Sequence, residues 1–308
     1  MIRALLIAGP TASGKSGVAL KLAERLGGRI VNADSMQVYR DLRLLTARPS
    51  EAETRRAGHL LYGEIDGAEN FSVGRWLERA RAAIAEARQA DTPLIFVGGT
   101  GLYFRVLTEG LSDIPRVPEA VRTQVRAEAE GLATPALHDR LAAADPLTAA
   151  RLRPSDRQRL LRALEIIVAT GRPLASFQGA RDAPALQADE WAGLFLAPER
   201  DALNRRVGER FAVMLREGAL DEVAALAARG LDPALPVRRA HGVPHLIAHL
   251  DRRLSLEEAS ERAINDTRRY AKRQFTWARH QMPGFRWVAP EAGEAAGAEA
   301  FGFSASHR

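Results

Sequence analysis

Gly9-Pro10-Thr11-Ala12-Ser13-Gly14-Lys15-Ser16 follows directly after the apolar run Leu5 to Ala8 and fits the pattern G-x-x-x-x-G-K-[ST]. Gly9 and Gly14 allow a close approach of the backbone to an anion, and the start of the following helix directs N–H groups at it. An ordinary glycine-rich turn is the alternative, but the helical pattern from Val18 to Leu26 argues against it. The stretch therefore predicts a P-loop, a phosphate site between a strand and a helix.

Two side chains of this loop suit phosphate chemistry. Lys15 is one of only three lysines in a chain with 44 lysines and arginines together, so a lysine stands where arginine is otherwise the rule. A compact ammonium on a flexible stem reaches between phosphates, whereas a planar guanidinium fits that position poorly. The Ser16 hydroxyl is expected to ligate Mg²⁺, which is the cofactor we predict.

Composition limits the class of protein. The 308 residues, 46% of them hydrophobic, can bury a core for one large or two smaller domains. The formal net charge of +6 suits a polyanionic partner. The chain has no cysteine, which excludes disulfides and thiolate metal sites. No apolar run approaches the roughly 20 residues of a membrane span and no signal-peptide pattern is present, so we expect a soluble cytoplasmic protein that contacts no membrane.

Strand and helix patterns alternate over the first 112 residues, as is typical of a parallel sheet covered by helices. The predicted strands are Ala4–Ala8, Arg29–Asn32 and Pro93–Val97, and a helix is predicted around Val73–Ala90. From Asp113 the pattern changes to short helical segments with apolar stripes, and strand character returns at Trp191–Leu196.

The sequence therefore predicts an α/β fold with three parts. Residues 1–112 and 191–290 form a P-loop NTPase-like core, a parallel sheet flanked by helices. Residues 113–190 form an all-helical insertion domain. Residues 291–308, rich in Ala, Gly and Glu, are expected to be a loosely held tail.

Two further predicted strands end in residues that can perform chemistry. Asp34 follows Arg29–Asn32 and could coordinate a metal, act as a general base or merely cap a helix. Thr100 follows Pro93–Val97, and the three glycines around it let a ligand approach, unless the segment is a plain tight turn. Many P-loop NTPases carry a Mg²⁺-binding Asp at such a strand end. The Gly98-Gly99 found here favours a pyrophosphate that does not belong to ATP or GTP.

The chain resembles one family closely, the tRNA dimethylallyltransferases, which prenylate an adenosine next to the anticodon. The blocks that carry the resemblance are GPTASGKS at Gly9–Ser16, DSMQVYR at Asp34–Arg40, VGGTGLY at Val97–Tyr103, DRQRLLRALE at Asp156–Glu165 and AKRQFTWAR at Ala271–Arg279. They come in the family's order and extend over nearly the whole chain except the tail. The resemblance implies transfer of a dimethylallyl group from dimethylallyl pyrophosphate to the exocyclic N6 amine of the adenosine 3′ to the anticodon, with release of pyrophosphate.

The resemblance also implies roles for individual residues. It makes Asp34 the general base that accepts the amine proton, and it assigns Thr100 and Arg210 to binding and activation of the pyrophosphate. Arg206, one turn earlier, is the second candidate for the arginine role, and a solvated helix face is the alternative for either arginine. Charge on the leaving group would be stabilised by the P-loop and by Mg²⁺ on Ser16. The implied pyrophosphate-binding residues are Gly9, Thr11, Ala12, Ser13, Gly14, Lys15 and Ser16.

RNA recognition must expose the target base, because its amine is inaccessible in a stacked loop. The residues for which the resemblance implies tRNA contact are Asp34, Ser35, Met36, Gln37, Thr100, Arg122, Gln158, Arg159, Leu160, Leu161 and Arg162. On pattern alone, the basic helix face of Arg159 and Arg162 could simply be solvated. A last long helix carries Arg269, Arg273, Trp277 and His280, which could bind phosphates and stack on bases, although Trp277 could equally be core. The expected partners are the tRNA anticodon stem-loop and dimethylallyl pyrophosphate, bound by a monomer.

Two segments depart from the family pattern. Leu45-Thr46-Ala47 stands where Gly-Thr-Ala is usual, and His241-Gly242-Val243 stands where Ile-Gly-Tyr is usual. The first predicts a changed backbone near the site, and the second makes a tRNA contact from Val243 doubtful.

Two rival classes of function remain. A small-molecule P-loop kinase would use Asp34 to position an acceptor hydroxyl, and a non-catalytic RNA-binding protein would use the P-loop as a nucleotide switch. Both leave Gly98-Gly99 and the other blocks unexplained.

Overall fold

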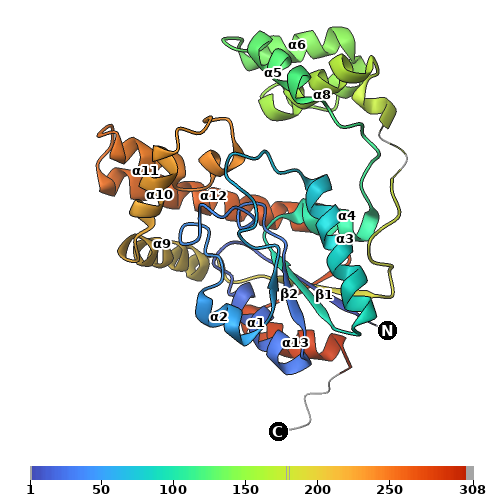
Figure 1. Ribbon diagram of the computed structural model, residues 1–308, viewed down its shortest axis with the longest axis vertical. Helices are drawn as coiled ribbons and strands as arrows, with labels where there is room; N and C mark the ends of the chain where they lie inside the picture. Colours follow the sequence, from blue (N-terminus) through green and yellow to red (C-terminus); the bar gives the residue numbers. More distant parts are fainter. Residues whose placement is uncertain (1, 178, 180, 303–308) are drawn as a thin grey trace. The chain divides into compact units, whose positions relative to one another are not determined.

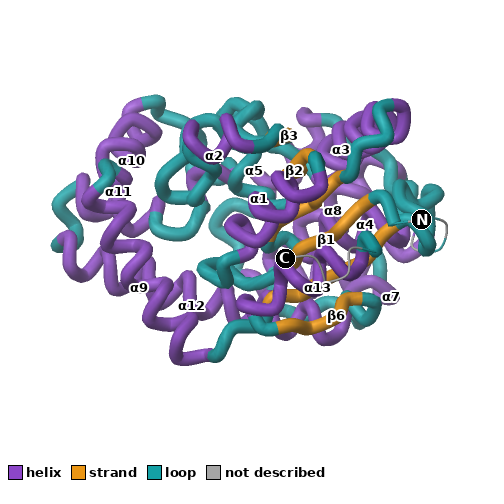
Figure 2. The backbone as a smooth tube through the Cα atoms, turned by 90° about the horizontal axis from the view of Figure 1, so that it is seen from below, coloured by secondary structure: helices purple, strands orange, loops and turns teal. Residues whose placement is uncertain are grey.

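The structure, a computed structural model that describes residues 2–177, 179 and 181–302, contains a parallel β-sheet (Figures 1 and 2). In the described residues its strand order is β3-β2-β4-β1-β5-β6, with every neighbouring pair parallel. The strands are β1 (Ala4–Ala8), β2 (Arg29–Asn32), β3 (His59–Leu60), β4 (Leu94–Gly98), β5 (Trp191–Leu196) and β6 (Phe285–Val288). The predicted α/β fold is confirmed, and β3 and β6 extend the sheet beyond the predicted strands.

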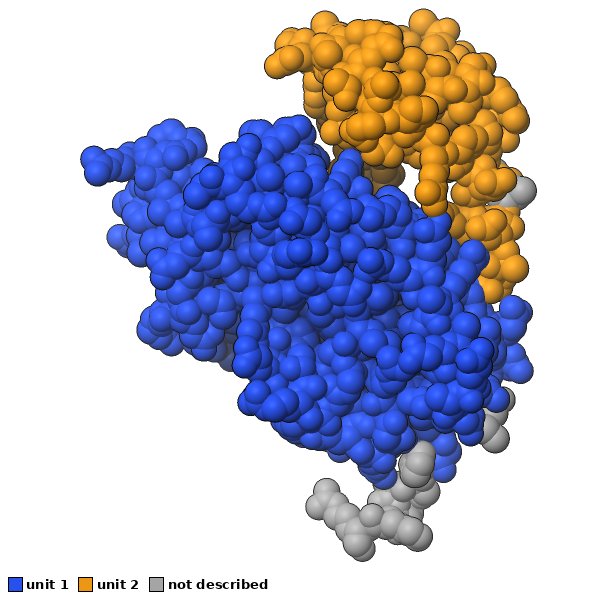
Figure 3. All heavy atoms as spheres, in the orientation of Figure 1, with its two compact units in different colours: residues 1–108, 185–308 blue, residues 109–184 orange. Residues whose placement is uncertain are grey.

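The chain divides into two compact units (Figure 3). The first, which we call the α/β unit, comprises Met1–Thr108 and Ala185–Arg308, and the second, the helical unit, comprises Glu109–Pro184. These limits differ from the expected 113–190 for a local reason. Asp182 N donates to Leu111 O at 2.9 Å within the helical unit, whereas Ala185 N and Leu186 N donate to Leu107 O at 2.9 and 3.1 Å within the α/β unit.

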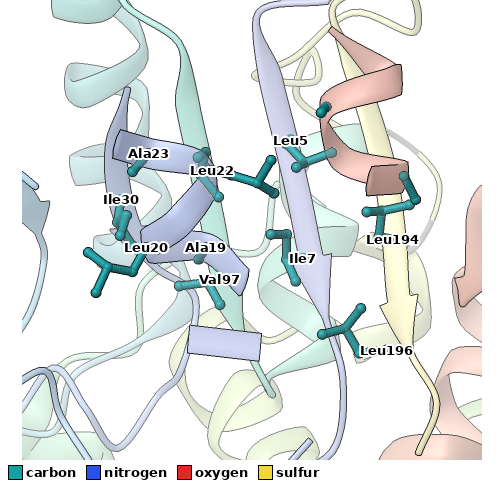
Figure 4. Packing of buried hydrophobic residues seen from close by; sticks show 13 residues of the cluster. Leu5, Ile7, Ala19, Leu20, Leu22, Ala23, Ile30, Val97, Leu194 and Leu196 are labelled. Carbon is teal, nitrogen blue, oxygen red and sulfur yellow. The ribbon is translucent and has the colours of Figure 1, made fainter. Parts of the chain in front are cut away.

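Alternation along the strands sends their side chains to two faces of the sheet. One face packs against α1 (Lys15–Leu26) and α13 (Gly293–Ala300) and includes Leu5, Ile7, Val97, Leu194 and Leu196 (Figure 4). On the other face, Phe96 meets Trp76 of α3 (Val73–Gln89), and Phe195 meets Phe275 of α12 (Leu256–Gln281). A sheet buried on both faces explains why its strands are continuous apolar runs.

The other helices of the α/β unit are α2 (Glu51–Arg56), α4 (Gly101–Glu109), α9 (Arg200–Arg216), α10 (Ala219–Ala228), η2 (Pro236–Arg239), α11 (Val243–Leu250) and η3 (Pro290–Ala292). The helical unit contains α5 (Glu119–Glu128), α6 (Thr134–Ala144), α7 (Pro146–Ala149), α8 (Arg157–Thr170) and η1 (Leu174–Phe177). Its core is built from the predicted apolar stripes, with Val125, Leu137, Leu141, Leu160 and Leu164 buried together. Across the described ranges, no helix is both long and apolar enough to cross a membrane.

The segment after β6 corrects the expectation of a loose tail from residue 291. Helix α13 packs on α1, and Ala296 and Ala298 are 6% and 2% exposed in the same core as Leu22. The composition was misleading because small side chains, which leave no strong apolar stripe, are also what allows a helix to approach its neighbour closely. Residues 303–308 of the expected tail lie outside the described residues.

Candidate active site

The P-loop leads from β1 into α1 and presents unsatisfied backbone donors. Gly14 precedes the helix in the left-handed region, at φ 86°, and no side chain of the described residues caps the helix. Its first N–H groups are therefore free to bind an anion. Ser13 is fully buried, and its Oγ has no hydrogen-bond partner in the described part of the chain. A bound phosphate oxygen would relieve that unsatisfied hydroxyl.

Lys15 is almost completely buried, at 9% relative exposure. Its Nζ donates to Pro10 O at 3.2 Å. Burial lowers the pKa of Lys15 to about 8; the charge of Asp34 raises this pKa and that of Arg210 lowers it further. The side chain thus remains mostly an ammonium at neutral pH, in surroundings where its attraction for an anion is little weakened by water.

Two residues from distant parts of the chain fix the loop. Arg210 of α9 donates through Nη2 to Thr11 Oγ1. Gln274 of α12, which is 8% exposed, accepts from Thr11 N at 3.1 Å and donates through Nε2 to Gly99 O at 2.8 Å. One amide side chain therefore connects the P-loop to the end of β4. Burial lowers the pKa of Arg210, and the charge of Asp34 opposes this shift.

Asp34 is positioned by a buried amide at the end of β2. Asn32, fully buried, accepts from Asp34 N at 2.8 Å through Oδ1 and donates to Asp34 O at 3.0 Å through Nδ2. The carboxylate Oδ1 accepts from Met36 N at 2.9 Å. The alternative role as a helix cap is wrong, because the next helix along the chain begins only at Glu51. Asp34 instead presents a half-buried carboxylate beside the P-loop.

The end of β4 is locked to the segment that follows β2. Thr100 Oγ1 accepts from Ser35 N at 3.0 Å and donates to Ser35 Oγ at 3.3 Å. At Gly98 the two backbones are so close that a Cβ would lie 2.0 Å from Ala33 O. Only glycine permits this approach, so Gly98 is what allows Thr100 to bond to Ser35, the neighbour of Asp34, at one edge of the sheet.

A cavity of about 220 Å³ opens at these strand ends, within the α/β unit. Its polar lining residues are Thr11, Asp34, Ser35, Thr46, Arg210, Arg239, His241, Thr267 and Tyr270. Its apolar lining residues are Met36, Leu45, Val207, Phe211, Met214 and Ala240. A cavity that combines phosphate-binding groups, one carboxylate and an apolar wall suits a ligand with an anionic head and a hydrocarbon tail.

The cavity brings together part of the set that the sequence singled out. Thr11, Asp34, Ser35, Met36 and Arg210 line it, and Thr100 is one hydrogen bond away. The Gln37 side chain bonds within the segment between β2 and α2, where its Nε2 donates to Thr46 O at 2.9 Å. Arg206 is not among the described residues that line the cavity.

The remaining predicted tRNA contacts lie on the helical unit. Arg122 pairs with Glu119 at 3.0 Å and Arg159 with Asp156 at 3.4 Å, while the side chain of Arg162 is 40% exposed and lies 3.8 Å from Glu165. Gln158 is exposed and Leu161 packs partly on the core. Leu160 is fully buried, in agreement with an apolar stripe of α8 that turns towards packing: this face of α8 packs against α5 and α6, so within the predicted contact segment the Leu160 side chain does not face RNA.

The sequence reasoning missed Tyr270, His241 and Gln274. The rings of His241 and Tyr270 lie 4.6 Å apart, and the Arg273 guanidinium lies 5.5 Å from the Tyr270 ring centre. Burial lowers the pKa of His241, as does Arg273, whereas Asp266 and Asp34 raise it, so the net shift favours the neutral imidazole. Gln274 had a usable signal: it shares the buried stripe of α12 with Ala271 and Ala278, where a polar residue needs a partner.

Two other expectations concern the elements around the site. Trp277 is half-buried and lies against the backbone of Gly101 at the start of α4, which favours packing over base stacking. Val243 is fully buried at the start of α11, so its side chain offers no surface to RNA.

The P-loop is compatible with a cation that arrives with a ligand. Among the described residues, no group of three or more His, Cys, Asp or Glu side chains could hold a metal. Ser16 is exposed in the first turn of α1, so its hydroxyl is accessible. Mg²⁺ commonly binds through one or two protein oxygens together with phosphate oxygens and water, an arrangement that Ser16 fits.

Known proteins resemble this chain along nearly its whole length. A sequence profile described as IPP transferase matches residues 37–281, and one described as isopentenyl transferase matches residues 2–70. A tRNA dimethylallyltransferase of Methylocella silvestris is 64% identical over 292 residues, covering 95% of this chain and 96% of the relative.

Solved structures agree. The full-length tRNA isopentenylpyrophosphate transferase of Bacillus halodurans has a TM-score of 0.69 at 32% identity, covering 98% of this chain and 97% of that one. A eukaryotic dimethylallyltransferase acting on tRNA has a TM-score of 0.78 at 26% identity, covering 94% of this chain and 74% of that one.

Proposed function

This chain belongs to the IPP transferase family, among tRNA dimethylallyltransferases, and we propose that its strand-end cavity is where the prenyl group is transferred. Its activity is that of a prenyltransferase that modifies tRNA. The donor we propose is dimethylallyl pyrophosphate, and the acceptor is the N6 amine of the adenosine 3′ to the anticodon. One observation carries the proposal: phosphate-binding groups, a carboxylate and an apolar wall line the same 220 Å³ cavity.

The proposed donor fits the cavity by its two chemical halves. Its pyrophosphate would lie on the P-loop from Gly9 to Ser16, against Lys15 and Arg210, and Thr100 would hold the segment that carries Asp34. Its five-carbon tail would lie on the apolar wall. Mg²⁺, held by Ser16 and the pyrophosphate oxygens, would supply further neutralisation of charge.

The proposed transfer of the prenyl group follows from the positions of the charged side chains. The adenine amine attacks C1 of the donor, so that an N–C bond forms while the C1–O bond breaks and its electron pair leaves with the pyrophosphate. Negative charge grows on the leaving oxygens, where Lys15 and Arg210 stabilise it. The amine is a poor nucleophile because its lone pair is delocalised into the ring, and the carboxylate of Asp34 accepts its proton as the N–C bond forms. Lys15 therefore assists a leaving group, with no phosphoryl transfer.

The target base must leave the anticodon stack to reach Asp34. We assign phosphate and base contacts to Arg122, Gln158, Arg159 and Arg162 of the helical unit and to Ser35, Met36 and Gln37 of the α/β unit. The ion pair of Arg159 with Asp156 is solvent-accessible and contributes little to stability, so Arg159 can exchange its carboxylate for a phosphate at low cost. We further propose that the enzyme works as a cytoplasmic monomer.

The deciding experiment supplies purified protein with an unmodified tRNA transcript, Mg²⁺ and dimethylallyl pyrophosphate. We expect digestion of the tRNA to yield one adenosine heavier by a five-carbon prenyl group, at the position 3′ to the anticodon. A transcript with guanosine at that position is the matched control and should stay unmodified. Absence of the adduct from a good substrate tRNA would overturn the proposal, and consumption of ATP without tRNA would point to the rival kinase.

A further inference from the structure

The apolar part of the cavity has a definite direction along α9. Val207, Arg210, Phe211 and Met214 all line it, and their spacing places them on one face over two successive turns. Arg210 reaches the P-loop, so a ligand whose anionic head binds there meets Phe211 and Met214 beyond it. The hydrocarbon tail of the donor therefore has to end against the residues that close the apolar side of the cavity.

Leu45 and Phe211 close the apolar side of the cavity. A Cβ placed on Gly242 would lie 3.2 Å from Leu45 Cδ1 and 3.3 Å from Phe211 Cε2, so both side chains rest directly on the bare backbone at that glycine. Leu45 is 8% exposed and Phe211 is 7% exposed, although both line the cavity. Gly242 itself has φ 94°, a conformation that favours glycine and leaves room for the leucine.

The backbone that carries Leu45 is fixed from outside the cavity. Glu222 of α10 accepts from Leu44 N at 2.9 Å through Oε1 and from Leu45 N at 2.9 Å through Oε2, and Arg43 N also donates to Oε1. In the same loop Thr46 Oγ1 donates to Leu42 O at 2.6 Å. A side chain on a backbone held this firmly acts as a wall, because it cannot move away without breaking these bonds.

We propose that Leu45, seated against Phe211 over Gly242, determines the length of prenyl chain that the enzyme accepts. The inference rests on the proposed function, because it assumes that the donor tail lies in this cavity. A tail longer than dimethylallyl meets the Leu45 methyl groups and cannot place C1 beside Asp34 while its pyrophosphate stays on the P-loop. In an apolar pocket of fixed shape, one methylene changes discrimination by about 10- to 200-fold.

The test measures kcat/KM for dimethylallyl pyrophosphate and for its homologue with one added methylene, 3-methylpent-2-enyl pyrophosphate, on the same tRNA. Leu45→Ala removes the wall and should raise the homologue-to-dimethylallyl ratio at least about 10-fold. Leu45→Met, which conserves side-chain volume, should restore the wild-type ratio. Leu44→Ala is the matched control: the same substitution in the same loop, at a residue bound to the same Glu222 but outside the cavity lining, should leave the ratio unchanged.

Each outcome decides the matter. A Leu45→Ala enzyme that transfers the dimethylallyl group with the wild-type ratio overturns the inference and leaves the proposed function intact. A wild-type enzyme that transfers neither tail overturns the proposed function first. If Leu45→Ala does not fold, Phe211→Leu opens the same wall from α9, and an unchanged ratio in that variant overturns the inference as well.

Discussion

The cavity of the α/β unit and the basic face of the helical unit hold their charged groups in opposite ways. Around the cavity, Asp34 is fixed by the buried Asn32, and the P-loop by the buried Gln274. On α8, Arg159 is 65% exposed and pairs with Asp156, the residue that caps the start of this helix. The charged groups around the cavity have little mobility and a fixed geometry. The exposed arginine side chains of the helical unit are long and free to follow a flexible partner. Bond making requires the fixed geometry, and binding a phosphate backbone requires only the free side chains.

The substitution Asp34→Asn is the strongest test of this contrast between the fixed charged groups of the cavity and the exposed arginines of the helical unit. The amide keeps the acceptor for Met36 N but cannot take a proton from the adenine amine, so we expect the transfer rate to fall by about 10²- to 10⁴-fold. Single-turnover transfer at saturating tRNA measures the rate, and filter binding measures the affinity for tRNA, which should stay within about twofold of wild type because one hydrogen-bonding group replaces another of the same shape. Comparable losses in both would mean that Asp34 is an anchor for RNA.

A pair of arginines on one helix tests whether position in the cavity decides function. Arg210→Ala removes a donor aimed at the leaving group and should lower kcat by about 10²- to 10³-fold. Arg206→Ala, one turn earlier, should change kcat by less than about threefold, because Arg206 is outside the described lining of the cavity. Steady-state kinetics on matched tRNA measures both, and equal losses would show that α9 contributes only general positive charge.

The pH dependence of donor binding tests the buried ammonium. Lys15 is cationic below its pKa of about 8 and neutral above it, so attraction for the pyrophosphate is present at low pH and lost as pH rises. We expect kcat/KM for the donor to fall towards about one tenth per pH unit above that value. Lys15→Met should be weakly active at every pH and lack this decline. A wild-type profile that is level from pH 7 to 9.5 would contradict the role given to Lys15.

The smallest effect is expected on the helical unit. Replacing Arg159 and Arg162 together by Ala should weaken tRNA binding and reduce the slope of log affinity against log salt by about 0.7 for each RNA phosphate that the variant no longer neutralises. The rate of the bound complex should not change. Arg140→Ala removes an arginine that pairs with Glu128 on the same unit and serves as the control. An unchanged slope in the double variant would place the RNA-binding face elsewhere.

Local patterns in the sequence determine how much of the fold and of the candidate site could be predicted. The bounds of β1 and β2 follow from apolar runs, and the nearness of the segments that carry Asp34 and Thr100 follows from the rule that parallel strands share one carboxyl edge. The hold of Glu222 on the Leu45 loop and that of Gln274 on Thr11 could not be foreseen, because each joins residues more than 170 positions apart. The packing of α13 was missed because alanines on a helix give no apolar signal until a neighbour is known.

The bond between Gln274 and Thr11 N sets an order of events during synthesis. The two residues are 263 positions apart, so at about 5–20 residues per second the P-loop emerges tens of seconds before the helix that fixes it. Until α12 docks, neither Thr11 N nor Gly99 O has this partner, and the loop and the end of β4 are not yet tied together. A nascent chain therefore carries its phosphate-binding sequence from the start but completes the site only when its last long helix has folded.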